Sequence, residues 1–486
     1  MAIMNAEQYE ESLHKLHLEV YLFGKRISNV VDDPIIRPSM NAVAATYEFA
    51  HKPEHEDIMT VRSHLSGEKI NRFCHIHQNT VDLVKKSKMG RLLGAHTACC
   101  FQRCVGMDAL NALSIVTHDI DAKYATGYYQ RFLKYLAYVQ EHDLTCDGAM
   151  TDPKGDRSLA PHQQKDPDLF MHVIEERQDG IVVRGAKAHQ TGALNSHEII
   201  VMPTIAMQQE DKEYAVSFAL PSDAEGIIYI IGRQSCDTRK LEKGTQDRGN
   251  QFYGGHEALV VFDDVFVPWE RVFMYKEYEF AGSLVEKFAS YHRQSYACKV
   301  GVGDVLIGAT QTIADYNGVQ KASHIRDKII EMNHLNETLF AGCIACASEG
   351  HREPSGTYCV NTLLANVHKQ NVTRFPYEIA RLAQDVAGGL MVTLPSEEDL
   401  NSPEIGKWLE KYYRANTDIP TRNRMRILRL IENITLGTAA VGYLTESMHG
   451  AGSPQAQRIM IARLVNMQEK QRNAKKLCGI EENDIF

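Results

Sequence analysis

The sequence has no long run of apolar residues and no excess of basic ones. None of its apolar stretches approaches the ~18 residues of a membrane-spanning helix, so we expect no membrane segment. The net charge of −9 leaves no basic stripe for a nucleic-acid backbone. Residues 1–15 contain three glutamates and no apolar core, so we expect no signal peptide. These absences predict a cytoplasmic protein that binds neither membranes nor nucleic acids.

The eleven cysteines show no disulfide pattern, because their number is odd and their spacings are scattered. Such usage is typical of reduced thiols, some structural and some ligands. Cys343 and Cys346 match a CxxC pair, but their apolar helical surroundings and the lack of a second pair favour buried structural thiols. Cys100 and Cys104 are four residues apart, so we expect them on one face of a helix.

The chain is long enough to predict two or three domains, since 486 residues exceed what one core accommodates. Helical spacing dominates residues 6–142 and begins with Tyr9, Leu13, Leu16, Val20 and Phe23. β-rich runs separated by turn residues follow, and helical spacing then returns. We therefore predict an α+β fold with an N-terminal helical domain (1–143), a middle β domain (144–275) and a C-terminal helical bundle (276–486).

The stretch from Tyr291 to Gly301 (YHRQSYACKVG) holds an imidazole, a phenol, a thiol and an amine. On an ideal helix His292, Tyr296 and Lys299 share one face. Three groups of different pKa on one buried face suit acid–base chemistry, although an ordinary helix with one buried histidine would contain the same residues. Together with the cysteine pair above, this stretch offers a possible four-ligand set for zinc or an iron–sulfur cluster.

Six longer motifs carry a resemblance to a known family. They are TACCFQRCVGMD (97–108), DGAMTDPKGDR (147–157), RGAKAHQTG (184–192), GHEALVVFD (255–263), YHRQSYACKVGVGD (291–304) and ESMHGAGSPQAQRIMIAR (446–463). With these motifs the chain resembles the 4-hydroxybutyryl-CoA dehydratases (vinylacetyl-CoA Δ-isomerases), in the flavin family that includes 4-hydroxyphenylacetate 3-monooxygenase. The resemblance covers nearly the whole chain. It implies an acyl-CoA dehydrogenase-like fold, an FAD cofactor and a homotetramer built as a dimer of dimers.

The resemblance also implies a [4Fe-4S] cluster with Cys100, Cys104, His292 and Cys298 as its ligands. Cys99 is not assigned, because the neighbouring residue on a helix points about 100° away. A Cys₃His set is also a legitimate zinc site, which remains an alternative.

One departure from the family pattern concerns the spacing of two of these ligands. The family has two small residues between Tyr296 and the ligand cysteine, whereas this chain has only Ala297. His292 and Cys298 are therefore six positions apart instead of seven, and on a straight helix they would point in different directions. A locally unwound helix, a different approach of the cysteine or an altered cluster would each account for this.

FAD is expected between the β domain and the helical bundle, and the resemblance assigns three segments to it. They are Met150, Thr151, Lys154, Gly155, Asp156 and Arg157, then His189, Gln190 and Thr191, then Gln384, Gly388 and Gly389. The first would supply backbone donors and positive charge, although by itself it could be a polar turn. The third would reach a neighbouring subunit's FAD, although so short a motif could also be ordinary helix packing.

The activity implied by the resemblance is dehydration of 4-hydroxybutyryl-CoA to crotonyl-CoA, with vinylacetyl-CoA Δ-isomerisation. Flavin would generate radical intermediates, and cluster iron would act as a Lewis acid on the 4-hydroxyl group. Six residues receive roles in this chemistry: His292, Glu446, Tyr296, Lys299, Glu257 and Thr191. The histidine would be both a ligand and the base for the α-proton. Glu446 would assist the departure of water, the tyrosine and lysine would position or protonate the substrate, and the last two would orient substrate and flavin.

Two other functions remain open from the sequence. A flavin monooxygenase of the same fold would hydroxylate an aromatic ring with reduced FAD, and would leave the three ligand cysteines unexplained. A non-catalytic scaffold that binds flavin or zinc is the second alternative.

Overall fold

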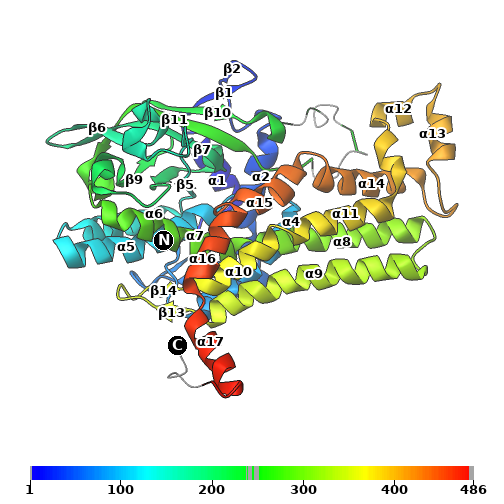
Figure 1. The fold of residues 1–486 in the computed structure, drawn as a ribbon. Coiled ribbons are helices and arrows are strands. Elements are labelled where there is room, and N and C mark those ends of the chain that lie inside the picture. The colour runs from blue at the N-terminus through cyan, green and yellow to red at the C-terminus, as the bar shows by residue number, and fades with distance from the viewer. Residues whose placement is uncertain (1–2, 237, 239–243, 246–250, 481–486) are drawn as a thin grey trace.

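The computed structural model describes residues 3–236, 238, 244–245 and 251–480. Strands gather on one side of the molecule, and long helices extend away from them (Figure 1). The mixed helix-and-sheet fold that the sequence predicts is confirmed. The bounds of the three predicted domains stay predictions. Among the described residues, no helix combines the length and the apolar character that crossing a bilayer needs.

The amino-terminal part is mainly helical but also contains four short strands. Its elements are α1 (Ala6–Leu13), β1 (Glu19–Leu22), β2 (Lys25–Ile27), α2 (Arg37–Ala50), α3 (Glu56–Met59), β3 (Thr60–Arg62), β4 (Lys69–Asn71), α4 (Thr80–Thr97), α5 (Cys104–Tyr124) and α6 (Tyr128–His142). The predicted helical spacing through Val20 and Phe23 is wrong, because α1 ends at Leu13 and Val20 lies in β1. Val20 and Leu22 are both buried in the core while the residues between and before them are not, which is the alternation of a strand.

Two sheets form the middle of the chain, from β5 (Cys146–Ala149), β6 (His172–Glu176), β7 (Gly180–Thr191), β8 (Glu198–Val201), β9 (Val216–Pro221), β10 (Ile227–Ile231), β11 (Glu257–Pro268) and β12 (Val272–Tyr275). The larger sheet has the order β2-β1-β10-β11-β7-β6, so the amino-terminal strand β1 joins it by parallel pairing with β10. The smaller has the order β12-β9-β8-β5. One apolar cluster joins both sheets to α5 and α6.

The carboxyl-terminal part is a helical bundle with one small hairpin. Its elements are α7 (Ala281–Ser295), α8 (Ala297–Tyr316), α9 (Ser323–Ser348), β13 (His351–Arg352), β14 (Tyr358–Cys359), α10 (Thr362–Val372), α11 (Phe375–Ala387), α12 (Glu397–Asn401), α13 (Gly406–Tyr412), α14 (Thr421–Thr435), α15 (Glu446–His449), α16 (Pro454–Leu464) and α17 (Met467–Leu477). A π-helical turn, Val441–Thr445, precedes α15. α17 has no buried residue and projects from the body (Figure 1).

Helices α4 and α8 pack unusually closely because glycines line their contact. A Cβ atom added to Gly94 would lie 2.2 Å from the carbonyl oxygen of Cys298, and one on Gly301 would lie 2.1 Å from that of Arg91. No side chain fits at either position, so the two backbones touch. This contact fixes the start of α8, and with it Cys298, against the amino-terminal part of the chain.

Candidate functional site

The stretch that the sequence predicts as one helical face is divided between two helices. α7 ends at Ser295, α8 begins at Ala297, and Tyr296 between them has ψ near 2°. The Tyr296 amide bonds to the carbonyl oxygen of Arg293, and the Lys299 amide bonds to that of Tyr296, which are the three-residue steps of a tightened turn. The expectation of one continuous helix is therefore wrong, and a local interruption separates His292 from Cys298.

The three proton-active groups nevertheless meet around the break. The ring centroids of His292 and Tyr296 are 5.6 Å apart. The Lys299 amine lies 5.7 Å from the centroid of the Tyr296 ring. Tyr296 and Lys299 are both buried. The tertiary structure thus brings these three side chains together, although they do not share the single helix face that the sequence predicts.

Cys100 and Cys104 do not share a helix, contrary to the sequence-based expectation. α4 ends at Thr97, Ala98 adopts a left-handed conformation (φ 50°), and α5 begins only at Cys104. The loop between them is held by Gln102, whose amide group donates to the carbonyl oxygen of Gly254 at 3.0 Å and accepts from Asn195 at 3.0 Å. Cys100 therefore lies in a loop that is anchored to the β-rich part of the chain, whereas Cys104 begins α5.

The thiols of Cys100, Cys104 and Cys298 are buried in one region. Burial is the main cause that raises the pKa of each. The other two thiolates further raise the pKa of Cys100, and the Cys298 thiolate further raises that of Cys104, so the three lie within electrostatic range of one another. Such thiols stay protonated unless a cation displaces the protons. This donor set fits a buried metal or cluster.

Cys99 is a near neighbour of this set. Burial raises the pKa of its thiol to about 12, and the Cys298 thiolate contributes to that shift. Cys99 and Cys100 both lie in the loop before α5, so the helical argument that separates them does not apply. The Cys104 thiolate is among the causes that raise the pKa of Cys100, so these two thiols lie within electrostatic range of each other.

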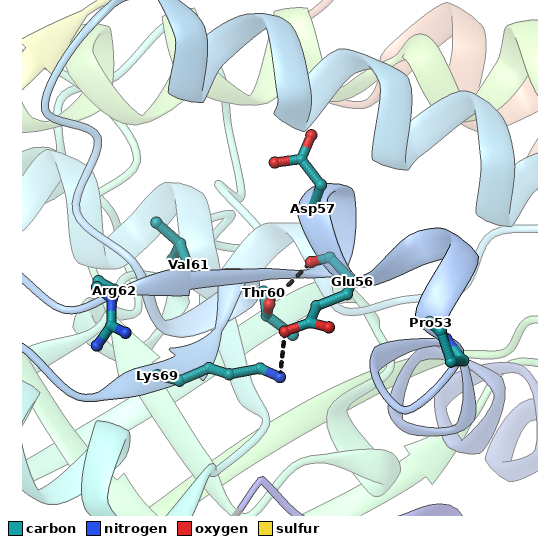
Figure 2. Close-up of a pocket in the computed structure, with 7 residues that line it drawn as sticks. All are labelled: Pro53, Glu56, Asp57, Thr60, Val61, Arg62 and Lys69. Carbon is teal, nitrogen blue, oxygen red and sulfur yellow. Dashed lines mark hydrogen bonds and ion pairs between the residues drawn. The ribbon is translucent and has the colours of Figure 1, made fainter.

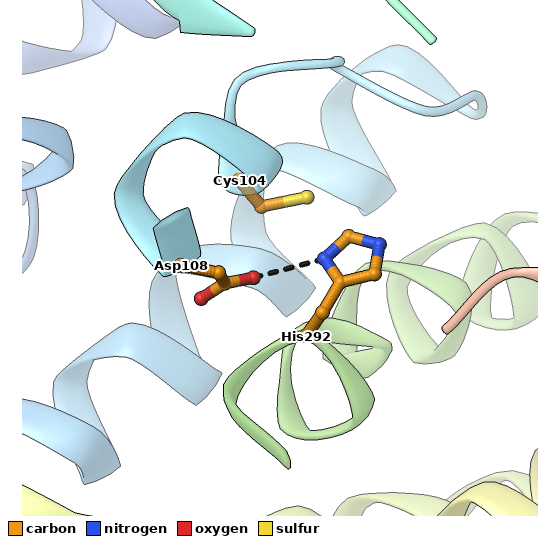
Figure 3. A group of neighbouring side chains, drawn as sticks. All are labelled: Cys104, Asp108 and His292. Atoms are coloured by element: carbon orange, nitrogen blue, oxygen red, sulfur yellow. Dashed lines mark hydrogen bonds and ion pairs between the residues drawn. The ribbon is translucent and has the colours of Figure 1, made fainter. Parts of the chain in front are cut away.

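His292 is held by a carboxylate that the sequence analysis did not single out (Figure 3). Its Nδ1 lies 2.9 Å from Oδ2 of Asp108, a fully buried residue of α5. Donor atoms of Cys104, Asp108 and His292 all lie within 4.8 Å of one another. Because the carboxylate accepts from Nδ1, the neutral imidazole keeps a free electron pair on Nε2. The spacing of four residues between Cys104 and Asp108 is the sequence signal that could have identified this residue.

Two further donors fix Asp108. Lys86 on α4 donates to Oδ1 at 2.6 Å, and the Ser295 hydroxyl donates to Oδ2 at 2.8 Å. Burial by itself would raise the pKa of Asp108, but Lys86 and then His292 hold that pKa below its usual value. The carboxylate is therefore ionised and fully hydrogen-bonded, which orients the imidazole rigidly.

The other predicted catalytic residues form a second chain of contacts. Lys299 donates to Glu446 Oε2 at 2.6 Å, and the Tyr296 hydroxyl donates to the Glu446 carbonyl oxygen at 3.0 Å. The Thr191 hydroxyl donates to Glu257 Oε2 at 2.6 Å, across the register of β7 and β11. The two chains of contacts join where the carboxyl groups of Glu257 and Glu446 share a hydrogen bond.

The two glutamates differ in protonation. Burial and then the Glu446 charge raise the pKa of Glu257 well above its ordinary value. Burial also opposes ionisation of Glu446, but Lys299 and the hydrogen bond from Glu257 lower the pKa of Glu446 below its ordinary value. Glu257 therefore holds a proton that it donates to an ionised Glu446, an arrangement suited to acid–base chemistry.

The first two predicted flavin segments lie side by side. The Ala188 amide donates to the Thr151 carbonyl oxygen at 2.8 Å, and Lys187 donates to that of Met150 at 3.0 Å. Lys154 (φ 73°) and Gly155 (φ 46°) are consecutive left-handed residues, a backbone geometry that suits turns around anionic groups. The first segment, with Met150, Thr151, Lys154, Gly155, Asp156 and Arg157, thus meets the strand that carries His189, Gln190 and Thr191. Of these residues, Thr191 contacts Glu257.

His449 connects α15 to this region. Burial, followed by Lys154 and His449, lowers the pKa of His189. The third predicted segment lies elsewhere: Gln384 is in α11, and Gly388 (φ 81°) and Gly389 follow its end. Within the described part of the chain, no hydrogen bond links this segment to the other two, so its role stays a prediction.

Two further features lie outside this site. A shallow surface hollow, crossed by an ion pair of 2.5 Å between Lys69 and Glu56 (Figure 2), shares no residue with the site. His351, Glu353 and Cys359 on the β13–β14 hairpin also lie close enough to hold a cation. There the Lys287 ammonium already pairs with Glu353 at 2.5 Å. The CxxC cysteines, Cys343 and Cys346, are buried in α9 as predicted.

Comparisons with known proteins cover the whole chain. The family model described as 4-hydroxyphenylacetate 3-hydroxylase N terminal matches residues 5–274, and its C-terminal counterpart matches residues 281–479. A 4-hydroxybutyryl-CoA dehydratase/vinylacetyl-CoA-Delta-isomerase of Clostridium aminobutyricum is 62% identical over 99% of this chain and 100% of that protein.

Solved structures agree with this. That of an oxygen-tolerant archaeal 4-hydroxybutyryl-CoA dehydratase from N. maritimus superimposes with a TM-score of 0.97 and 56% identity, covering 100% of this chain and 97% of that one. The oxygenase component of 4-hydroxyphenylacetate 3-monooxygenase complexed with FAD has a TM-score of 0.86 at 21% identity, covering 98% of both chains. At that identity the likeness concerns the fold alone.

Proposed function

Because the chain belongs to the 4-hydroxyphenylacetate 3-hydroxylase family, and within it to the 4-hydroxybutyryl-CoA dehydratases, we propose that it dehydrates 4-hydroxybutyryl-CoA to crotonyl-CoA and isomerises vinylacetyl-CoA. The chain is thus a lyase with isomerase activity. The observation that carries this is identity of 62% over full length to a dehydratase, against 24% to a monooxygenase oxygenase component of Thermus thermophilus. The monooxygenase alternative is a distant relation.

The cofactors that this function needs are FAD and a [4Fe-4S] cluster. Cys100, Cys104, Cys298 and Nε2 of His292 would hold the cluster. Two observations support this: the three buried thiols lie within electrostatic range of one another, and the donor atoms of Cys104 and His292 lie within 4.8 Å of each other. The paired segments around Thr151 and Ala188 would hold FAD. When bound, the flavin supplies one-electron chemistry and the cluster supplies a Lewis-acidic iron.

His292 is the group best placed to remove the α-proton of the substrate, which the thioester makes acidic. Asp108 ties down Nδ1 at 2.9 Å, so the one free electron pair of the ring, on Nε2, would serve in turn as cluster ligand and as proton acceptor. The imidazolium that forms is stabilised by the same ionised carboxylate. Lys86, bonded to the other oxygen of Asp108 at 2.6 Å, keeps that carboxylate from turning.

The glutamate pair provides the proton for the departing hydroxyl group. Glu257 holds a proton at the oxygen that faces Glu446, and Glu446 is charged next to Lys299. Transfer of this proton from Glu257 to the substrate would leave Glu257 and Glu446 both ionised. The positive charge of Lys299 offsets the added negative charge. Tyr296 and Thr191 fix the carbonyl of one glutamate and the carboxyl of the other.

The assembly would be a homotetramer built as a dimer of dimers, with an acyl-CoA dehydrogenase-like chain. In such an assembly the segment with Gln384, Gly388 and Gly389 would contact the FAD of a neighbouring subunit. The exposed helix α17 supports association, since none of its residues is buried within the described chain.

Anaerobically purified protein tests the proposal directly. We expect FAD and about four irons per chain, and formation of crotonyl-CoA from 4-hydroxybutyryl-CoA. Glu446→Gln should retain both cofactors and lose dehydration by about 10²-fold or more, as loss of a positioned acid or base does. Cys104→Ala should lose iron and activity together. An active, iron-free Cys104→Ala protein would refute the cluster, and unchanged activity in Glu446→Gln would refute the site.

A further inference from the structure

A buried lysine that has no role in the chemistry above contacts the site from a separate helix. Lys369 belongs to α10 and is fully buried. Its amine lies 4.1 Å from the centroid of the Tyr296 ring and donates to the carbonyl oxygen of Ser447. Within the described part of the chain this amine forms no ion pair with a carboxylate, so Lys369 is not half of a pair that merely stabilises the bundle.

The segment that Lys369 contacts has an irregular backbone. α15 is a single turn, Glu446–His449, and it follows the π-helical turn Val441–Thr445. Ala451 (φ 55°) and Gly452 (φ 97°) then adopt left-handed conformations. So short a helix cannot satisfy its own last carbonyl groups, and these need partners from elsewhere. π-helical turns of this kind are common at functional sites.

Two neighbouring residues of α15 are fixed by side chains from other helices. Tyr296 donates to the carbonyl oxygen of Glu446 at 3.0 Å, and Lys369 donates to that of Ser447. Lys299 holds the Glu446 carboxylate at 2.6 Å. Without Lys369, the carbonyl next to the catalytic glutamate would have no partner from the bundle, and the turn that carries the glutamate could shift.

We infer that Lys369 is a positioning residue that holds α15 and the Tyr296 ring in place, so that the Glu446 carboxylate stays aligned with Lys299 and Glu257. The inference deepens the proposed function and rests on it. Burial, followed by the charges of Lys299 and Arg293, lowers the pKa of Lys369 well below its ordinary value. An uncharged amine needs no carboxylate partner, and it can still donate to the Ser447 carbonyl oxygen.

The test uses Lys369→Met, which keeps the alkyl chain beside the Tyr296 ring and removes only the donor. Lys369→Gln restores a shorter donor. Lys328→Met is the control, because Lys328 of the neighbouring helix α9 pairs with Asp385 at 2.6 Å and lies outside the site. All three are measured as the holoenzyme, with FAD and iron contents determined.

We expect Lys369→Met to lower kcat by about tenfold or more, the size of one lost buried hydrogen bond, with little change in KM for the acyl-CoA. Lys369→Gln should recover part of the loss. In the Glu446→Gln background, Lys369→Met should have almost no further effect, because a positioning residue has nothing left to position. Full additivity of the two substitutions, or a kcat of Lys369→Met equal to that of the control, would overturn the inference.

Hydrogen exchange separates this inference from the activity itself. In Lys369→Met, amides of residues 441–452 should exchange faster, including that of Gly450, which bonds to the Glu446 carbonyl oxygen at 2.8 Å. Amides of β8 should be unchanged. If the wild-type enzyme fails to dehydrate the substrate, the proposed function fails while the exchange result still decides the role of Lys369. Unchanged exchange in this segment would refute that role.

Discussion

The bond between His292 and Asp108 makes the sharpest prediction about the site. Asp108→Asn keeps the shape of the side chain but removes the charge that accepts from Nδ1 of His292 at 2.9 Å. Loss of the carboxylate behind a metal-bound histidine typically weakens metal binding by about 10- to 100-fold, which corresponds to roughly 1.4–2.7 kcal/mol. The substitution should also remove the charge that stabilises the imidazolium and so weaken His292 as a base.

The same substitution also affects stability, because it leaves Lys86 without its ionic partner in a fully buried position. Removing one member of such a pair costs about 3–5 kcal/mol. Lys86→Met combined with Asp108→Asn removes the unpaired charge, so the double variant should be more stable than Asp108→Asn by thermal unfolding. It should remain equally poor at retaining iron.

A matched control exists elsewhere in the chain. Asp82 accepts from His75 at 3.0 Å and from Arg72 at 3.1 Å in another buried histidine–carboxylate–cation group. Asp82→Asn should destabilise the fold by a comparable amount and leave the iron content of the folded fraction unchanged. The assay is iron retention against a chelator under anaerobic conditions, together with crotonyl-CoA formation. Equal iron loss in Asp82→Asn and Asp108→Asn would show that the effect is general destabilisation, and would refute the reasoning.

Three further predictions concern other parts of the chain. In an anaerobic iron assay, Cys100→Ala should lose iron and Cys99→Ala should keep at least most of it. The opposite result would make Cys99 the ligand in place of Cys100. Burial raises the pKa of the Asp147 carboxyl from 3.8 to about 7. Between these pH values the native state holds a proton that the unfolded state has lost. The free energy of unfolding therefore falls as pH rises from 3.8 to 7, by up to about 4 kcal/mol. Asp147→Asn should remove this fall in stability. If the variant's unfolding curves at pH 5 and pH 8 differed as much as those of the wild type, the prediction would be contradicted. Gly94→Ala should push α8 away from α4 at Cys298 and reduce both iron content and thermal stability; a normal iron content would contradict it.

Strands, helices and buried thiols could be predicted from the sequence, whereas the contacts between distant segments that form the site could not. The β-rich runs expected after the amino-terminal helices coincide with strands such as β8, and the CxxC cysteines are buried in α9. Both depend on short patterns of apolar residues, which local sequence encodes. The fold class follows from the order of such patterns along the chain.

The site depends on long-range contacts that no spacing encodes. Thr191 meets Glu257 only through the register of β7 with β11. The spacing from Cys104 to Asp108 is local, but only the packing of α5 on α7 places Asp108 against His292. The left-handed Ala98 ends α4 although alanine favours helix, so tertiary packing overrides local propensity and separates Cys100 from Cys104.

The junction at Tyr296 lets the chain vary in length at one point without disturbing its surroundings. Inside a continuous helix, one deleted residue would rotate everything that follows by about 100°. α8 cannot rotate, because Gly94 and Gly301 leave no room between it and α4. At a junction each helix keeps its own register and only the connecting residues adjust. A residue can therefore be gained or lost at this junction while α7 and α8 each keep the faces that they present to the rest of the chain.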